Sequence, residues 1–99
     1  MEPAWRELDS HTSVVFLHVP AAKLVVLQAL FETYEGLGLV RTLDMRRGLI
    51  SILAAPDMQQ DCTALLKAVW EQTGWRNAAV PDALERDLLF GYFKKESHA

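Results

Sequence analysis

Two short apolar segments separated by a polar turn constrain the fold of this chain more than any other feature of its sequence. Residues 39–43 (LVRTL) and 49–53 (LISIL) are rich in leucine and β-branched residues, a composition that is typical of β-strands. The stretch between them begins with Asp44 and ends with Gly48, two residue types that favour tight turns. The sequence therefore predicts a β-hairpin.

Two loop lengths fit this hairpin, and they differ in which side chains share a face of the sheet. A three-residue loop over residues 46–48 groups five residues on one face: Val40, Thr42, Ile50, Ile52 and Ala54. A four-residue loop that starts at Met45 shifts the pairing by one residue. In either register both faces carry large apolar side chains, whereas a half-exposed sheet alternates apolar with polar residues. We therefore expect a cover on each face: helices of this chain on one, and either the C-terminal segment or a second subunit on the other.

The spacing of apolar residues predicts the other elements. Residues 12–19 (TSVVFLHV) have almost no polar interruption, which is typical of a central strand. Residues 21–35 and 56–73 carry apolar side chains at steps of three and four, so each indicates an amphipathic helix. With a short, weak strand over residues 75–80, the order becomes βαββαβ. This order predicts an α+β, ferredoxin-like sandwich with an antiparallel sheet.

The length of the chain suits one domain with a single modest core. We expect that domain over residues 12–80, after an N-terminal tail over residues 1–11 in which Trp5 and Leu8 could lie against the domain. Residues 81–99 are expected to form an extra C-terminal helix and tail, since Asp82 and Glu85 have the spacing of a capping box.

The composition excludes several classes of protein. The net charge of −3 gives no general attraction to nucleic acid, and no apolar run reaches the roughly 20 residues of a membrane helix. The acidic N-terminus does not resemble a secretory signal. We therefore expect a cytoplasmic protein with neither nucleic-acid nor membrane partners. The single cysteine and the scattered histidines offer no metal-binding spacing, so we expect no metal and no cofactor.

Polar residues at the end of the first predicted helix and on the strand after it form a candidate ligand-binding site: Glu32, Glu35, Arg41, Thr42 and Asp44. Arg41 lies between two leucines, and a buried guanidinium needs a carboxylate partner or an anionic ligand. A structural ion pair is the simpler interpretation of Arg41. Arg46 and Arg47 are interpreted as a solvated turn, and His18 as a residue that caps its strand or lines a cleft. The spacing assembles no nucleophile, base and orienting group, so no catalytic residue is predicted.

Four short motifs carry a resemblance to a known family: residues 34–36 (YEG), 41–44 (RTLD), 47–48 (RG) and 55–57 (APD). Together with the strand before them, they resemble a bacterial domain of unknown function, family 4911, over about residues 13–66. The resemblance implies a small bacterial cytoplasmic protein and carries no activity with it. The βαββαβ order is also similar to that of ACT-type ligand-binding domains. The turn at residues 19–22 departs from that family, because it lacks the glycine beside which amino-acid effectors dock.

These observations leave several functions open. We expect first a non-enzymatic protein-interaction or regulatory module that self-associates, as a homodimer, or binds another protein through the helix-free sheet face or a sheet edge. The alternative is an ACT-like sensor of a small anionic metabolite, with Arg41 and Thr42 at the ligand. An enzyme or an RNA-binding domain is expected least, because residues 47–53 lack the stacking aromatic residues of an RNA-recognition strand.

Overall fold

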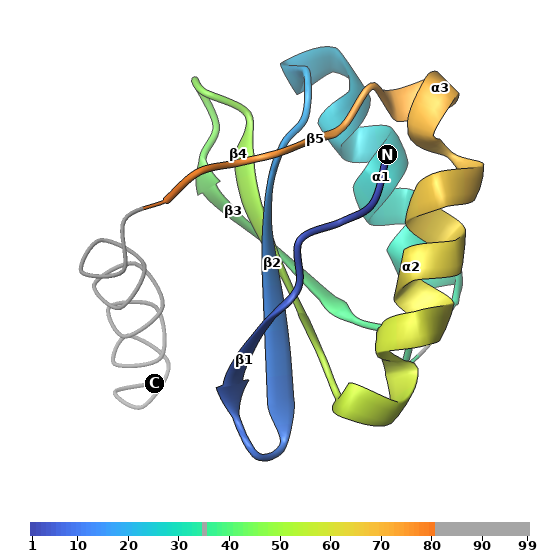
Figure 1. The fold of residues 1–99 in the computed structure, drawn as a ribbon. Coiled ribbons are helices and arrows are strands. Elements are labelled where there is room, and N and C mark those ends of the chain that lie inside the picture. The colour runs from blue at the N-terminus through green and yellow to red at the C-terminus, as the bar shows by residue number, and fades with distance from the viewer. Residues whose placement is uncertain (35, 81–99) are drawn as a thin grey trace, which may run out of the picture.

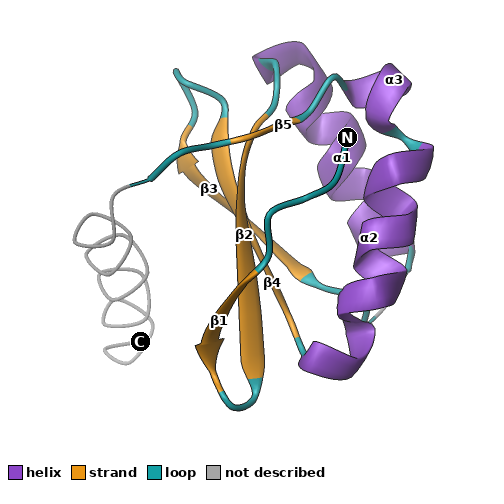
Figure 2. Cartoon of the chain, viewed as in Figure 1, coloured by secondary structure: helices purple, strands orange, loops and turns teal. Residues whose placement is uncertain are grey.

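The computed structural model describes residues 1–34 and 36–80, and it has an antiparallel sheet with helices packed on one side (Figure 1). The elements in chain order are β1 (Arg6–Asp9), β2 (Thr12–His18), α1 (Ala21–Thr33), β3 (Leu39–Asp44), β4 (Leu49–Ala54), the 3₁₀ turn η1 (Pro56–Met58), α2 (Gln59–Ala68), α3 (Trp70–Thr73) and β5 (Arg76–Asn77). Figure 2 shows the division into a strand layer and a helix layer. The predicted α+β class with an antiparallel sheet is confirmed.

The sheet has β2 and β4 at its centre. Its strand order is β1-β2-β4-β3, and β5 also pairs with β2. Since β4 occupies one side of β2, the strands β1 and β5 share the other side. β1 lies along the first half of β2, and β5 lies opposite Leu17 and His18. The weak strand predicted over residues 75–80 is therefore present only as the two residues of β5.

The hairpin combines features of both predicted registers. Its loop has four residues, because Asp44 is paired with Leu49. A β-bulge between Thr42 and Asp44 then shifts the register, so that Thr42 pairs with Ile50 and Val40 with Ile52. The extra residue returns the side chains to the faces expected for the shorter loop.

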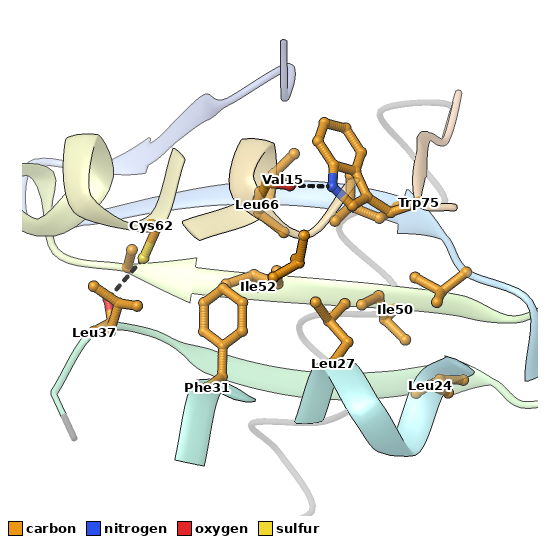
Figure 3. Packing of buried hydrophobic residues seen from close by; sticks show 14 residues of the cluster. Val15, Leu24, Leu27, Phe31, Leu37, Ile50, Ile52, Cys62, Leu66 and Trp75 are labelled. Atoms are coloured by element: carbon orange, nitrogen blue, oxygen red, sulfur yellow. Dashed lines mark hydrogen bonds between the residues drawn. The ribbon is translucent and has the colours of Figure 1, made fainter. Parts of the chain in front are cut away.

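The main core fills the space between the sheet and the helices (Figure 3). α1 contributes Leu24, Leu27 and Phe31, all of which are buried. Trp75 is fully buried among them, and its indole N–H donates to the carbonyl oxygen of Leu66 at 2.6 Å. This bond satisfies a carbonyl in the last turn of α2, where the helix runs out of backbone donors.

The helix predicted over residues 56–73 is interrupted. Pro56 opens a 3₁₀ turn, and α2 ends before α3 begins because Val69 has φ −105° and ψ 10°, outside the helical range. Val69 is itself buried in the core. The break allows the short α3 to pack against α1 on a separate course.

The second face of the sheet is also buried over its central strands. Val14, Phe16 and Leu53 are 0%, 3% and 8% exposed and form a second apolar cluster, with Ala78 and Val80 packed against it. The centre of the sheet is therefore shielded on both faces in a single copy of the chain, whereas Leu39 on β3, which pairs with Leu53, is 44% exposed. A second subunit is not needed to bury these three side chains. The predicted C-terminal helix over residues 81–99 lies outside the described residues.

The N-terminal segment lies against the domain, although it was expected to be a tail. The indole N–H of Trp5 donates to Thr63 Oγ1 at 2.8 Å, and Asn77 Nδ2 donates to the carbonyl oxygen of Glu2 at 2.8 Å. β1 follows directly and pairs with β2 through backbone bonds, while all four of its side chains are exposed. Because no apolar pattern marks such a strand, the sequence offers no signal for it.

Candidate functional site

The structure disperses the residues of the predicted ligand site. Thr42 Oγ1 accepts a hydrogen bond from Gln28 Nε2 of α1 at 3.2 Å, so Thr42 faces the helix layer. Arg41 and Glu32 line a common depression of about 330 Å³ at the outer edge of β3. Glu35, which belongs to the same predicted set, lies outside the described residues. Among the described members of this set, only Glu32 and Arg41 are therefore brought to one place.

Asp44 stabilises the hairpin turn. Its Oδ1 accepts hydrogen bonds from the backbone N–H groups of Arg46 at 3.0 Å and Arg47 at 3.3 Å. Its Oδ2 lies 3.6 Å from Arg47 Nε, in an ion pair whose side chains are both well exposed. The two backbone bonds are those of an aspartate that caps a turn. The prediction that Asp44 belongs to the ligand site beside Arg41 gains no support from this arrangement.

A second depression lies where three segments of the chain meet: the link between β2 and α1, the β3–β4 turn, and the start of β5. Its volume is about 310 Å³. We call it the basic pocket, and its lining residues are His18, Val19, Pro20, Ala21, Arg46, Arg47, Gly48, Gly74 and Arg76.

Backbone contacts hold the walls of the basic pocket together. The N–H of Val19 donates to the carbonyl oxygen of Gly48 at 2.8 Å, and His18 Nδ1 lies 3.2 Å from the carbonyl oxygen of Arg47. On the opposite wall Gly74 adopts φ +68° and ends α3, which turns the chain into β5. β5 then pairs Arg76 with His18.

The basic pocket is positively charged within a chain whose net charge is −3. Arg46, Arg47 and Arg76 line it, and no carboxylate is among its described lining residues. The 13-residue helix α1 begins at the same place, with no side-chain cap and no acidic residue in its first turn. The first backbone N–H groups of α1 and the positive end of its dipole therefore add to the positive electrostatic potential of the basic pocket.

This lining is suited to binding an anion. A guanidinium is protonated at all physiological pH values and offers paired N–H donors that match carboxylate or phosphate oxygens. Serine, cysteine and carboxylate side chains, which include the common enzymatic nucleophiles, are absent from the described lining, whereas His18 is of the type that most often acts as a general base. The part of the chain that the structure describes also contains no group of three or more potential metal ligands.

Most of this site has no signal in the sequence. Arg46 and Arg47 have the pattern of a solvated turn, and nothing in the local sequence marks Arg76 for a role. Only His18 was expected to line a cleft as one of two possibilities, and the structure places it in the pocket wall. Arg76 reaches the pocket through pairing between strands nearly sixty residues apart, which no local pattern reveals.

The family model described as "Domain of unknown function (DUF4911)" matches residues 7–72. The chain belongs to this family. The DUF4911 segment contains His18, Arg46 and Arg47, whereas Arg76 follows its end. Comparisons with curated proteins and with solved structures find no match. Among residues 1–34 and 36–80, no helix is long and apolar enough to cross a membrane.

Proposed function

We propose that this DUF4911 domain is a non-enzymatic regulatory module that binds a small anionic ligand in the basic pocket. The observation that carries the proposal is the meeting of Arg46 and Arg47 from one turn with Arg76 from a distant strand at one cavity. Like charges gathered in this way repel each other, and a bound anion relieves the repulsion while accepting several charge-assisted hydrogen bonds.

A ferredoxin-like layout supports a ligand-sensing role. When β1 is set aside, the chain runs strand, helix, two strands, helix and strand, with β5 beside β2. We propose that β1 is an addition to this ACT-like plan. The basic pocket then lies at the turn after the first strand of the plan, where Val19 and Pro20 replace the expected glycine.

The version of the sensor based on Arg41 and Thr42 has weaker support. Thr42 is already hydrogen-bonded to Gln28, and Glu32 places a carboxylate in the depression that Arg41 lines. A carboxylate beside the ligand would repel an anion. The basic pocket has no such group among its described lining residues.

Self-association remains a second candidate function, and the open edge of β3 favours it. Among the described residues no strand pairs with the outer side of β3, and Leu39 on this strand is 44% exposed. An apolar edge of this kind can pair with a second copy. A homodimer would therefore form through the edge of β3 rather than through the centre of the rear face, where Val14, Phe16 and Leu53 are already buried. Light scattering after size-exclusion chromatography tests this, and a monomer at tens of micromolar contradicts it.

Thermal unfolding of the full chain tests anion binding. We expect sodium phosphate or sulfate to raise the Tm more than sodium chloride does at the same ionic strength. Both anions also stabilise folded proteins by exclusion from the protein surface, so the part of the rise that is lost in a pocket variant measures specific binding. Arg76→Gln should weaken this binding about tenfold or more, as expected for loss of a charge-assisted hydrogen bond. Lys67→Gln removes the same charge on the exposed surface of α2 and serves as the control. Equal Tm values in all three salts, or equal losses in the two variants, would contradict the proposal.

A further inference from the structure

The charge, donors and shape of the basic pocket narrow the class of its ligand. Resting on the function proposed above, we infer that the ligand is a small phosphate monoester, and not a carboxylate or a nucleotide. Three features of the pocket lead to this class: its excess of positive charge, the spread of its donors, and the absence of phenylalanine, tyrosine and tryptophan from its described lining.

The charge of the pocket matches a dianion. Arg46, Arg47 and Arg76 carry three permanent positive charges, and the neighbouring carboxylate of Asp44 offsets one of them through its ion pair with Arg47. About two positive charges are left over. A phosphate monoester carries about −1.5 to −2 at pH 7, whereas a single carboxylate carries only −1.

The donors of the pocket approach from several directions. Arg46 and Arg47 belong to the β3–β4 turn, and Arg76 belongs to β5. The backbone N–H groups at the start of α1 follow directly after the link from β2. A phosphoryl group has three acceptor oxygens arranged around a tetrahedral centre and can be reached from all these sides. A carboxylate has only two acceptor oxygens, and both lie in one plane, so it meets fewer of these donors with good geometry.

The basic pocket has room for a ligand larger than a bare phosphate. A cavity of about 310 Å³ has room for on the order of ten waters at ~30 Å³ each, which exceeds what one phosphate displaces. The exposed side chains of Pro20 and Ala21 provide a small apolar wall that suits a short carbon chain, whereas the side chain of Val19 is buried in the core. Since Phe, Tyr and Trp are all missing from the described lining, a nucleobase could stack only on the small ring of His18 or on a guanidinium group, and the guanidinium groups would already be engaged by the phosphate.

Isothermal titration calorimetry on the full chain tests this class directly. The probes are glycerol 3-phosphate, succinate as a dicarboxylate of equal charge, and AMP, all at pH 8 and one ionic strength. We expect glycerol 3-phosphate to bind at least tenfold more tightly than succinate, and AMP to bind no more tightly than glycerol 3-phosphate. Arg46→Gln and Arg76→Gln should each reduce the affinity for glycerol 3-phosphate more than the affinity for succinate. Lys67→Gln should change neither.

The outcomes separate this inference from the proposed function. If succinate binds as tightly as glycerol 3-phosphate, the pocket binds anions but the phosphate class is wrong. If AMP binds tenfold more tightly than glycerol 3-phosphate, the exclusion of nucleotides is wrong. If none of the three probes binds, and phosphate and sulfate raise the Tm of Arg76→Gln as much as that of the parent chain, both the inference and the proposed function fail. The arginines are exposed at the surface, so the variants should fold, and the Tm of each unliganded variant verifies this.

Discussion

Val19, in the link before α1, is in direct backbone contact with Gly48, at the end of the β3–β4 turn. The N–H of Val19 donates to the carbonyl oxygen of Gly48 at 2.8 Å, and a Cβ atom added to Gly48 would lie 2.0 Å from the carbonyl oxygen of Val19. Gly48 also adopts φ +63°, a conformation that favours glycine. The wall of the basic pocket therefore depends on a residue without a side chain at this position.

Gly48→Ala should consequently lower the free energy of unfolding by about 3 kcal/mol or more, because backbone strain is joined by a clash with backbone. Gly36→Ala is the matched control. Gly36 has φ +81° but no atom within 4 Å of its added Cβ, so it should lose only the strain energy of about 1–2 kcal/mol. Urea denaturation measures both values, and equal losses would show that the contact with Val19 is unimportant.

Asp44→Asn should increase the affinity of the basic pocket for anions. The substitution removes the carboxylate charge that competes for Arg47 and keeps an oxygen that can accept the turn N–H groups of Arg46 and Arg47. Exposed ion pairs contribute about 0.2–1 kcal/mol, so the gain should be at most about fivefold. Titration with phosphate in low salt measures it. Weaker binding by this variant would indicate that Asp44 positions Arg47 for the ligand.

Cys62 should react slowly with thiol reagents in the folded protein. Its thiol is buried and donates to the carbonyl oxygen of Leu37 at 2.8 Å, and burial, followed by the charge of Asp61, raises its pKa to about 11. We expect labelling by a disulfide reagent at pH 8 only after denaturant is added. Rapid labelling of the native protein would show that this part of α2 opens.

The same pKa shift predicts a decrease in stability at alkaline pH. Because the folded state holds the proton more tightly than the unfolded state, the stabilisation from the neutral thiol is complete below pH 9 and is lost as the pH rises towards 11. Cys62→Ala should lack this part of the decrease. The measurement is the difference in unfolding free energy between the two proteins from pH 8 to pH 11, and a constant difference contradicts the prediction.

Ser51 and Thr73 are buried hydroxyl residues that should respond oppositely to substitution. Ser51 is fully buried, and its hydroxyl has no hydrogen-bond partner among the residues described, whereas Thr73 Oγ1 donates to the carbonyl oxygen of Val69 at 2.8 Å. Ser51→Ala should be neutral or stabilising by up to about 1 kcal/mol, and Thr73→Val should destabilise by about 1 kcal/mol. Thermal and urea unfolding of both variants provide the test. A marked decrease in the free energy of unfolding of Ser51→Ala would contradict the prediction.

Local patterns predicted the elements that bury apolar side chains. β2, α1 and the hairpin have such patterns, and the structure contains all three. β1 was missed because it contributes backbone bonds and exposed polar side chains to the sheet. The break at Val69 was missed because it depends on tertiary contacts, which the apolar spacing of α2 and α3 does not show.

The candidate site was predicted less well for a related reason. The unusual position of Arg41 between two leucines drew attention to the outer edge of β3. The exposed arginines of the turn and of β5 look ordinary in sequence, and they form a site only after β5 pairs with the end of β2. Sites of this kind depend on contacts between distant segments, and a single sequence does not specify such contacts locally.

The sharing of one side of β2 by β1 and β5 limits how copies of this domain can assemble. On that side of β2, another copy of the chain would meet only the four-residue, charged strand β1 and the two-residue strand β5. Neither is a good template for further strand pairing. Among the described strands, β3 alone combines six residues with an unpaired outer side. Two copies joined along β3 would use up that side in both molecules, so growth would end at a closed pair and would not continue into fibres.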